Sequence, residues 1–104
     1  MADEELRDFL LGELSDIGVR SRAMFGGHGL YLGDKFFGMI TDGAVYFRTG
    51  DESREEYRAR GMAALQPKNR VRGPRTVDRN FEVPPEVLED QALLVEWALR
   101  AAQA

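Results

Sequence analysis

Residues 24–49 have the sequence MFGGHGLYLGDKFFGMITDGAVYFRT, and this stretch decides the fold. It holds two turn signals, Gly33-Asp34 and Asp42-Gly43. The second is a pair that type I′ hairpins favour, because both central residues of that turn need positive φ. The two turns separate three short runs, which are Gly29–Leu32, Lys35–Thr41 and Ala44–Thr49. We expect these runs to form an antiparallel β-meander.

A further strand is expected over Ser21–Phe25, before the run Gly26-Gly27-His28-Gly29. This run is not a phosphate loop, because no Gly-Lys-Ser/Thr sequence ends it. The strands expected on both sides also leave no helix N-terminus that could hold a phosphate. We therefore expect a bulge or a sharp bend between two strands, where glycine permits positive φ or a close backbone approach.

The two-residue turns fix the register and hence the faces of the expected sheet. One face would carry Tyr31, Phe36, Ile40, Val45 and Phe47, and the other Leu30, Leu32, Phe37, Met39 and Tyr46. Both faces are apolar, whereas a sheet with a single buried face alternates apolar and polar residues. Either the protein's own helices cover both faces, which is the arrangement we expect, or a partner covers one of them.

Helices are expected at both ends of the chain. Apolar residues at helical spacing run from Leu6 to Ile17 and stop at Gly18. A polar surface helix should follow over 51–60, then a short strand reaching Val83, a helix starting at Pro84-Pro85, and a final helix capped by Asp90. The predicted fold class is α+β, with an antiparallel β-meander sheet of about five strands packed with N-terminal and C-terminal helices.

Length and composition fit one domain over residues 1–104. The chain has no cysteine, which excludes disulfides and thiolate metal sites. Its N-terminus is acidic rather than basic and apolar, and no apolar run approaches the roughly 20 residues that span a bilayer. We expect a cytoplasmic protein without membrane contact.

The net charge of −4 is unevenly distributed. Residues 66–80 contain one acid, Asp78, and five bases, which are Lys68, Arg70, Arg72, Arg75 and Arg79. This basic segment could contact nucleic-acid phosphates or an acidic protein, or its arginines could pair with the acidic first and last helices. No aromatic residue interleaves these bases, and the chain has no helix-turn-helix or RNA-binding signature.

Catalytic machinery is not evident. His28 is the only histidine, and no serine lies in a nucleophile-elbow motif. In a glycine-rich turn we expect His28 to face solvent or to bond to backbone. One histidine without cysteines closes no metal coordination sphere. We therefore expect neither a metal nor a cofactor and do not predict an enzyme.

The segment from Arg22 to Tyr31, RAMFGGHGLY, resembles the signature of the TfoX (Sxy) N-terminal domain family. Segments 36–40 and 46–48 and the pair Trp97-Ala98 are similar to later parts of that family. The resemblance implies a bacterial α+β domain that precedes a helical second domain in competence-gene regulators, which work with the cyclic-AMP receptor protein. This chain ends at Ala104, so it would be a stand-alone relative. The matching motif residues Phe25, Gly26, Gly27, Gly29 and Tyr31 carry over as structural residues only.

The sequence and the resemblance together lead us to expect a non-enzymatic interaction or regulatory domain that acts through protein–protein contact, and that could form a homodimer. An alternative is an accessory protein that contacts nucleic acid through residues 68–79. A second alternative is a small enzyme with an unrecognised site.

Overall fold

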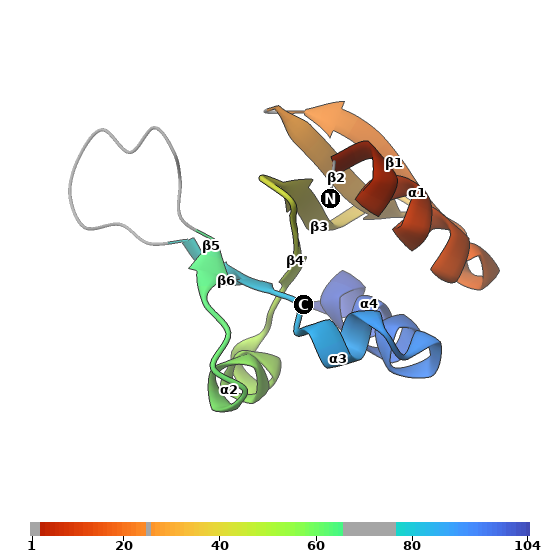
Figure 1. The fold of residues 1–104 in the computed structure, drawn as a ribbon. Helices are drawn as coiled ribbons and strands as arrows, with labels where there is room; N and C mark the ends of the chain where they lie inside the picture. Colours follow the sequence, from red (N-terminus) through yellow and green to blue (C-terminus); the bar gives the residue numbers. More distant parts are fainter. Residues whose placement is uncertain (1–2, 25, 66–76) are drawn as a thin grey trace.

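The computed structural model describes residues 3–24, 26–65 and 77–104, and it consists of one sheet with helices from both ends of the chain (Figure 1). The elements are α1 (Asp3–Glu13), the 3-10 turn η1 (Ser15–Ile17), β1 (Val19–Met24), β2 (Gly27–Leu32), β3 (Lys35–Thr41), β4 (Ala44–Arg48), α2 (Asp51–Ala59), β5 (Ala64–Leu65), β6 (Val77–Glu82), α3 (Pro85–Leu88) and α4 (Gln91–Gln103). The predicted α+β class is confirmed.

The sheet has the strand order β1-β2-β3-β4-β6-β5, and every neighbouring pair is antiparallel. The first four strands form the predicted meander. β6 then returns to lie beside β4, and the two-residue β5 pairs with its outer side. β5 makes six strands where about five were expected.

The Asp42-Gly43 turn has the predicted conformation, with φ of 52° at Asp42 and 77° at Gly43. It sets Ile40 opposite Val45 and Gly38 opposite Phe47, as the turn length predicted. The register of the β3–β4 hairpin is therefore confirmed.

The β2–β3 hairpin departs from regular pairing. Tyr31 lies opposite Phe36, but Leu30 lies opposite Gly38, so Phe37 is an extra residue in β3. This β-bulge turns the Phe37 side chain into the core, where it is 1% exposed, while Phe36 is 37% exposed. The predicted faces are therefore wrong for β2 and the start of β3, because a regular ladder would have placed Phe36 in the core.

One face of the sheet builds the core together with the helices. The core is made by side chains from the strands, from the helices and from the residue that follows α1. The strands supply Leu30, Phe37, Ile40, Val45, Phe47 and Phe81, the helices supply Leu6, Leu10, Tyr57, Val87, Leu94, Trp97, Ala98 and Ala101, and Leu14 follows α1. Both α1 and α4 contact β3 and β4. Among the described residues no helix contributes a buried side chain to the other face. The expectation that the protein's own helices cover both faces is wrong for this part of the chain.

The terminal helices largely follow their sequence signals. The first helix ends earlier than expected, at Glu13, and the 3-10 turn η1 follows it; Gly18 ends η1 in the left-handed conformation, with φ of 76°. Asp90 caps α4 by accepting a hydrogen bond from the Leu93 amide at 3.2 Å. Phe9 is one of the apolar residues between Leu6 and Ile17 whose spacing predicted a common buried face, but it is 39% exposed. No described helix is long and apolar enough to cross a membrane.

Candidate functional site

The uncovered face of the sheet carries aromatic, methionine and arginine side chains. The strand register aligns one row across β1, β2, β3, β4 and β6, made of Arg22, Gly29, Met39, Tyr46 and Glu82. A second row contains Arg20, Tyr31 and Phe36. Burial, and then the carboxylates of Glu82 and Asp42, raise the pKa of Tyr46 above its ordinary value. We call this surface the open face.

Gly29 shapes the centre of the open face. A Cβ atom at this position would lie 2.9 Å from Met24 Sδ and 3.0 Å from Phe36 Cε1. The missing side chain therefore lets Met24 and Phe36 lie against the backbone of β2. The Tyr31 and Phe36 rings are 5.4 Å apart at 45°. Phe36 thus packs against the sheet on one side and meets solvent on the other.

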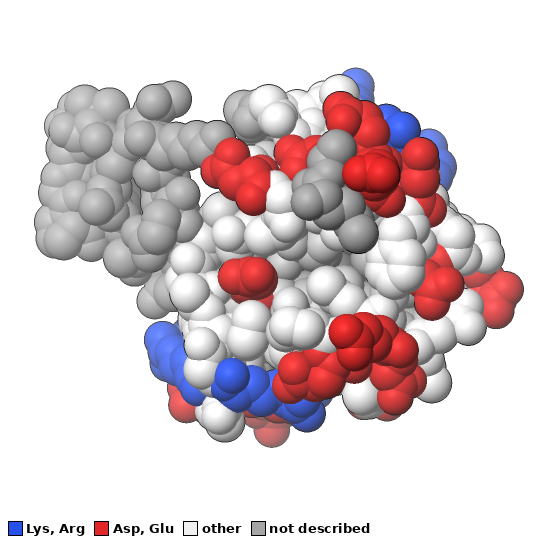
Figure 2. All heavy atoms as spheres, in the orientation of Figure 1, with Lys and Arg blue, Asp and Glu red and all other residues white. Residues whose placement is uncertain are grey.

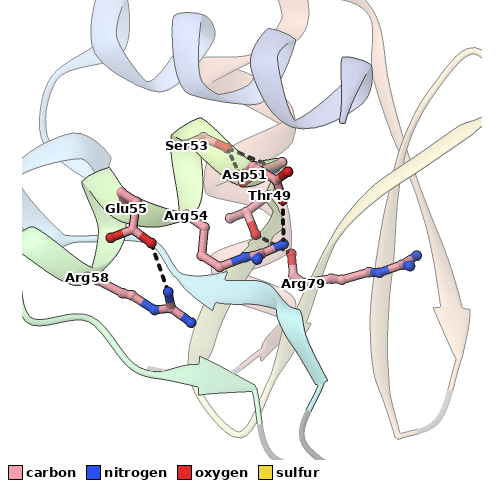
Figure 3. A network of polar contacts seen from close by, with 8 residues as sticks. Thr49, Asp51, Ser53, Arg54, Glu55, Arg58 and Arg79 are labelled. Atoms are coloured by element: carbon pink, nitrogen blue, oxygen red, sulfur yellow. Dashed lines mark hydrogen bonds and ion pairs between the residues drawn. The ribbon is translucent and has the colours of Figure 1, made fainter.

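The arginines of the open face differ from those near the helices. Arg54, Arg58, Arg60 and Arg100 each have a carboxylate within 4 Å. Figure 3 shows two of these pairs within α2, Arg54 with Asp51 and Arg58 with Glu55, while the Arg79 guanidinium extends away from the network.

In the part of the chain that the structure describes, three guanidinium groups make no hydrogen bond or ion pair, and these belong to Arg22, Arg48 and Arg79. Arg20 donates to the Gly33 carbonyl at 3.1 Å and has no acidic partner among the described residues. Positive charge on this side of the molecule is therefore not neutralised within the described structure.

Two hollows lie beside the aromatic pair. One, of about 220 Å³, is lined by Phe36, Arg48, Arg79 and Asn80. The other, of about 460 Å³, is lined by Arg20, Ser21, Arg22, Tyr31, Gly33 and Asp34. Each hollow therefore combines one aromatic ring with two arginines.

The predicted basic segment is only partly described. Lys68, Arg70, Arg72 and Arg75 lie outside the described residues. Arg79 is exposed on β6, and its carbonyl accepts a hydrogen bond from Thr49 Oγ1 at 2.9 Å. Arg79 lines a hollow together with Arg48 and Phe36. The sequence did not predict that these three residues lie together. The one local sequence signal for the open face was a pair of arginines at alternate positions of β1, Arg20 and Arg22, which share one side of that strand.

The glycine-rich motif joins two strands, as predicted. Gly26 has φ of 78° in the turn, and Gly27 and Gly29 lie in β2. Tyr31 lies on the open face, and Phe25 lies outside the described residues. A purely structural role for the motif residues stays a prediction.

His28 contradicts the expectation of a solvent-facing or backbone-bonded residue. It lies on the core face of β2 opposite Ile40, its side chain is 11% exposed, and its Nε2 is 3.9 Å from Glu4 Oε2. The motif forms a strand rather than an open turn from Gly27 onward, which carries His28 under α1. Across the described ranges, no three of His, Cys, Asp and Glu come together as metal ligands.

The helical side has the opposite character. Figure 2 shows acidic side chains spread over the region of α1 and of α3 and α4, while basic side chains gather near α2 and at the edge beside β1. Phe9 on α1 and Leu99 on α4 are 39% and 38% exposed. The two helices contact each other, and Gln91 Nε2 donates to the Glu13 carbonyl at 3.1 Å. We call this surface the helical face.

The described structure is a small α+β domain with two chemically distinct surfaces and a buried histidine. The family model of the TfoX N-terminal domain matches residues 10–104, and the chain therefore belongs to the TfoX N-terminal domain family. Membership makes it a competence-regulator-like domain. No curated protein matches the chain.

Proposed function

We propose that this domain is a non-enzymatic regulatory module that acts by contact with another protein through its helical face. Two of the three large apolar side chains exposed in the described structure, Phe9 and Leu99, lie on α1 and α4. Their exposure on two helices that contact each other is the observation that carries the proposal.

The chemistry of the helical face defines the partner. Exposed apolar side chains bordered by charged residues are typical of protein interfaces. Acids at the start of α1, Asp3, Glu4 and Glu5, supply that rim. The partner is expected to present an apolar patch bordered by lysine or arginine, and binding should weaken as salt screens the rim.

Photocrosslinking tests this proposal directly. A photoreactive amino acid is placed at Phe9, at Leu99, or at the exposed Glu52 of α2 as a control, and each variant is irradiated in a lysate of the source organism. Positions 9 and 99 should give the same discrete adduct, which Phe9→Glu in the Leu99 variant abolishes. Identical adducts from position 52, or none from 9 and 99, would contradict a partner at the helical face.

A second copy of the chain is one candidate for the partner. Light scattering over a dilution series of the pure domain separates this case from a different protein. A dimer that Phe9→Glu dissociates would identify self-association as the contact. A monomer at every concentration would leave the crosslinked adduct to define the partner.

A further inference from the structure

We propose that the open face binds single-stranded nucleic acid, with a base stacked on Phe36 and phosphates held by the unpaired arginines around it. This surface is distinct from the helical face, and its test is independent of the protein contact proposed there.

The stacking position follows from the packing of Phe36. Its ring lies against the backbone at Gly29 and is 37% exposed, so part of the ring remains available to a planar group. Tyr31, at 5.4 Å, supports the ring from the side. A base stacked on an aromatic ring needs no particular sequence, because every base has a π-face.

The phosphate positions follow from the charges. Arg48 and Arg79 line one hollow together with Phe36, and Arg20 and Arg22 line the other. Guanidinium groups without a carboxylate partner are free to form bidentate contacts with phosphate oxygens. Asn80 in the first hollow adds an amide that can donate to or accept from a base edge.

The spacing suits a chain of several nucleotides. Arg22 lies on β1 and Arg48 on β4, three strand spacings apart, which is about 14 Å. Positive charge therefore borders the aromatic pair on two sides. A line of phosphates crossing the strands could contact both borders while one base covers Phe36.

Charge favours an anionic occupant and limits its position. Arg20, Arg22, Arg48 and Arg79 contribute four positive charges, against Asp34 in one hollow and Glu82 at the end of the central row. The carboxylates should keep phosphates away from Tyr46 and direct them to the arginines. An acidic protein segment would contact the same arginines, but its affinity would not depend on stacking against Phe36. Substitution of Phe36 therefore distinguishes the two occupants.

Fluorescence anisotropy with a labelled 12-nucleotide oligothymidylate measures the binding. Three arginine–phosphate contacts predict a slope near −2 in log affinity against log salt, so binding should weaken about 20-fold between roughly 50 and 200 mM salt. Phe36→Ala should weaken binding about five- to 100-fold, and Phe36→Tyr should restore it. Replacing Arg48 and Arg79 by alanine should lower affinity and flatten the slope.

Matched controls come from the rest of the chain. Phe9→Ala removes an equally exposed aromatic ring from the helical face, and Arg58→Ala removes an arginine already paired with Glu55 at 2.8 Å. Neither should change the affinity for the oligonucleotide. Circular dichroism melts of every variant confirm that each one is folded.

Three results would overturn the inference. The first is no binding at low salt. The second is binding that depends on Arg70, Arg72 and Arg75 but is indifferent to Phe36→Ala. In the third, poly-L-glutamate displaces the labelled oligonucleotide equally well from the wild-type domain and from the Phe36→Ala variant. This result would assign the open face to an acidic protein.

Discussion

The β-bulge predicts opposite consequences for two adjacent phenylalanines. Phe37 is 1% exposed, and its ring lies 5.4 Å from that of Phe47 in an edge-to-face arrangement, whereas Phe36 is 37% exposed. Truncation of a buried phenylalanine to alanine costs about 3–5 kcal/mol. Phe36→Ala should cost about 1 kcal/mol or less, because much of its ring already meets solvent.

Urea and thermal unfolding measure this difference, with fluorescence of Trp97, the only tryptophan, as the probe. A domain of this size has a total stability of about 5–15 kcal/mol, so Phe37→Ala should leave a marginal fold and lower Tm by about 12 °C or more. Phe36→Ala should lower Tm by only a few degrees, as should the control Phe9→Ala. A larger loss from Phe36→Ala than from Phe37→Ala would refute the bulge, because a regular ladder places Phe36 in the core.

Three further changes test other parts of the fold. Gly27→Ala would place a Cβ atom in steric conflict with the Ile40 carbonyl oxygen, so urea unfolding should reveal a loss of about 2 kcal/mol or more, and a neutral change would contradict this close approach. Asp90→Ala removes the cap on the Leu93 amide and should cost about 1 kcal/mol, with Asp90→Asn keeping most of it. Burial raises the pKa of Tyr57 above its ordinary value of 10.0, so the unfolded chain releases this proton first and stability should fall as pH rises above about 10. Urea titrations at pH 8 and 10.5 should show that Tyr57→Phe reduces this loss, and an unchanged pH dependence would count against the effect.

Local signals predicted the meander well, because turn chemistry is a property of two or three adjacent residues. Gly33-Asp34 and Asp42-Gly43 fixed where the strands begin and end, and Asp90 fixed the start of α4. No local sequence signal indicated the β-bulge. Phe36 and Phe37 are chemically identical, so composition could not decide which of them faces the core, and in the structure it is Phe37 that packs against Phe47.

The open face was harder to predict, because its residues come from strands distant in the sequence. The strand order β1-β2-β3-β4-β6 is what brings Arg22, Arg48 and Arg79 to the surface around Phe36. The absence of aromatic residues within the basic segment 68–79 counted against nucleic-acid contact there, but the sheet supplies the aromatic ring from β3. His28 was misplaced for a related reason, since its burial depends on α1 lying across β2.

The return of β6 to the side of β4 also decides when the molecule can fold. Domains emerge from the ribosome N-terminal end first, so Val45 and Phe47 appear well before Phe81 and Trp97, which complete the surroundings of this strand. Until Glu82 is synthesised, β4 presents an unsatisfied hydrogen-bonding edge and an apolar surface, a combination that recruits other chains. A nascent chain arrested before Val77 should therefore depend on chaperones to remain unaggregated, rather than forming a smaller folded unit.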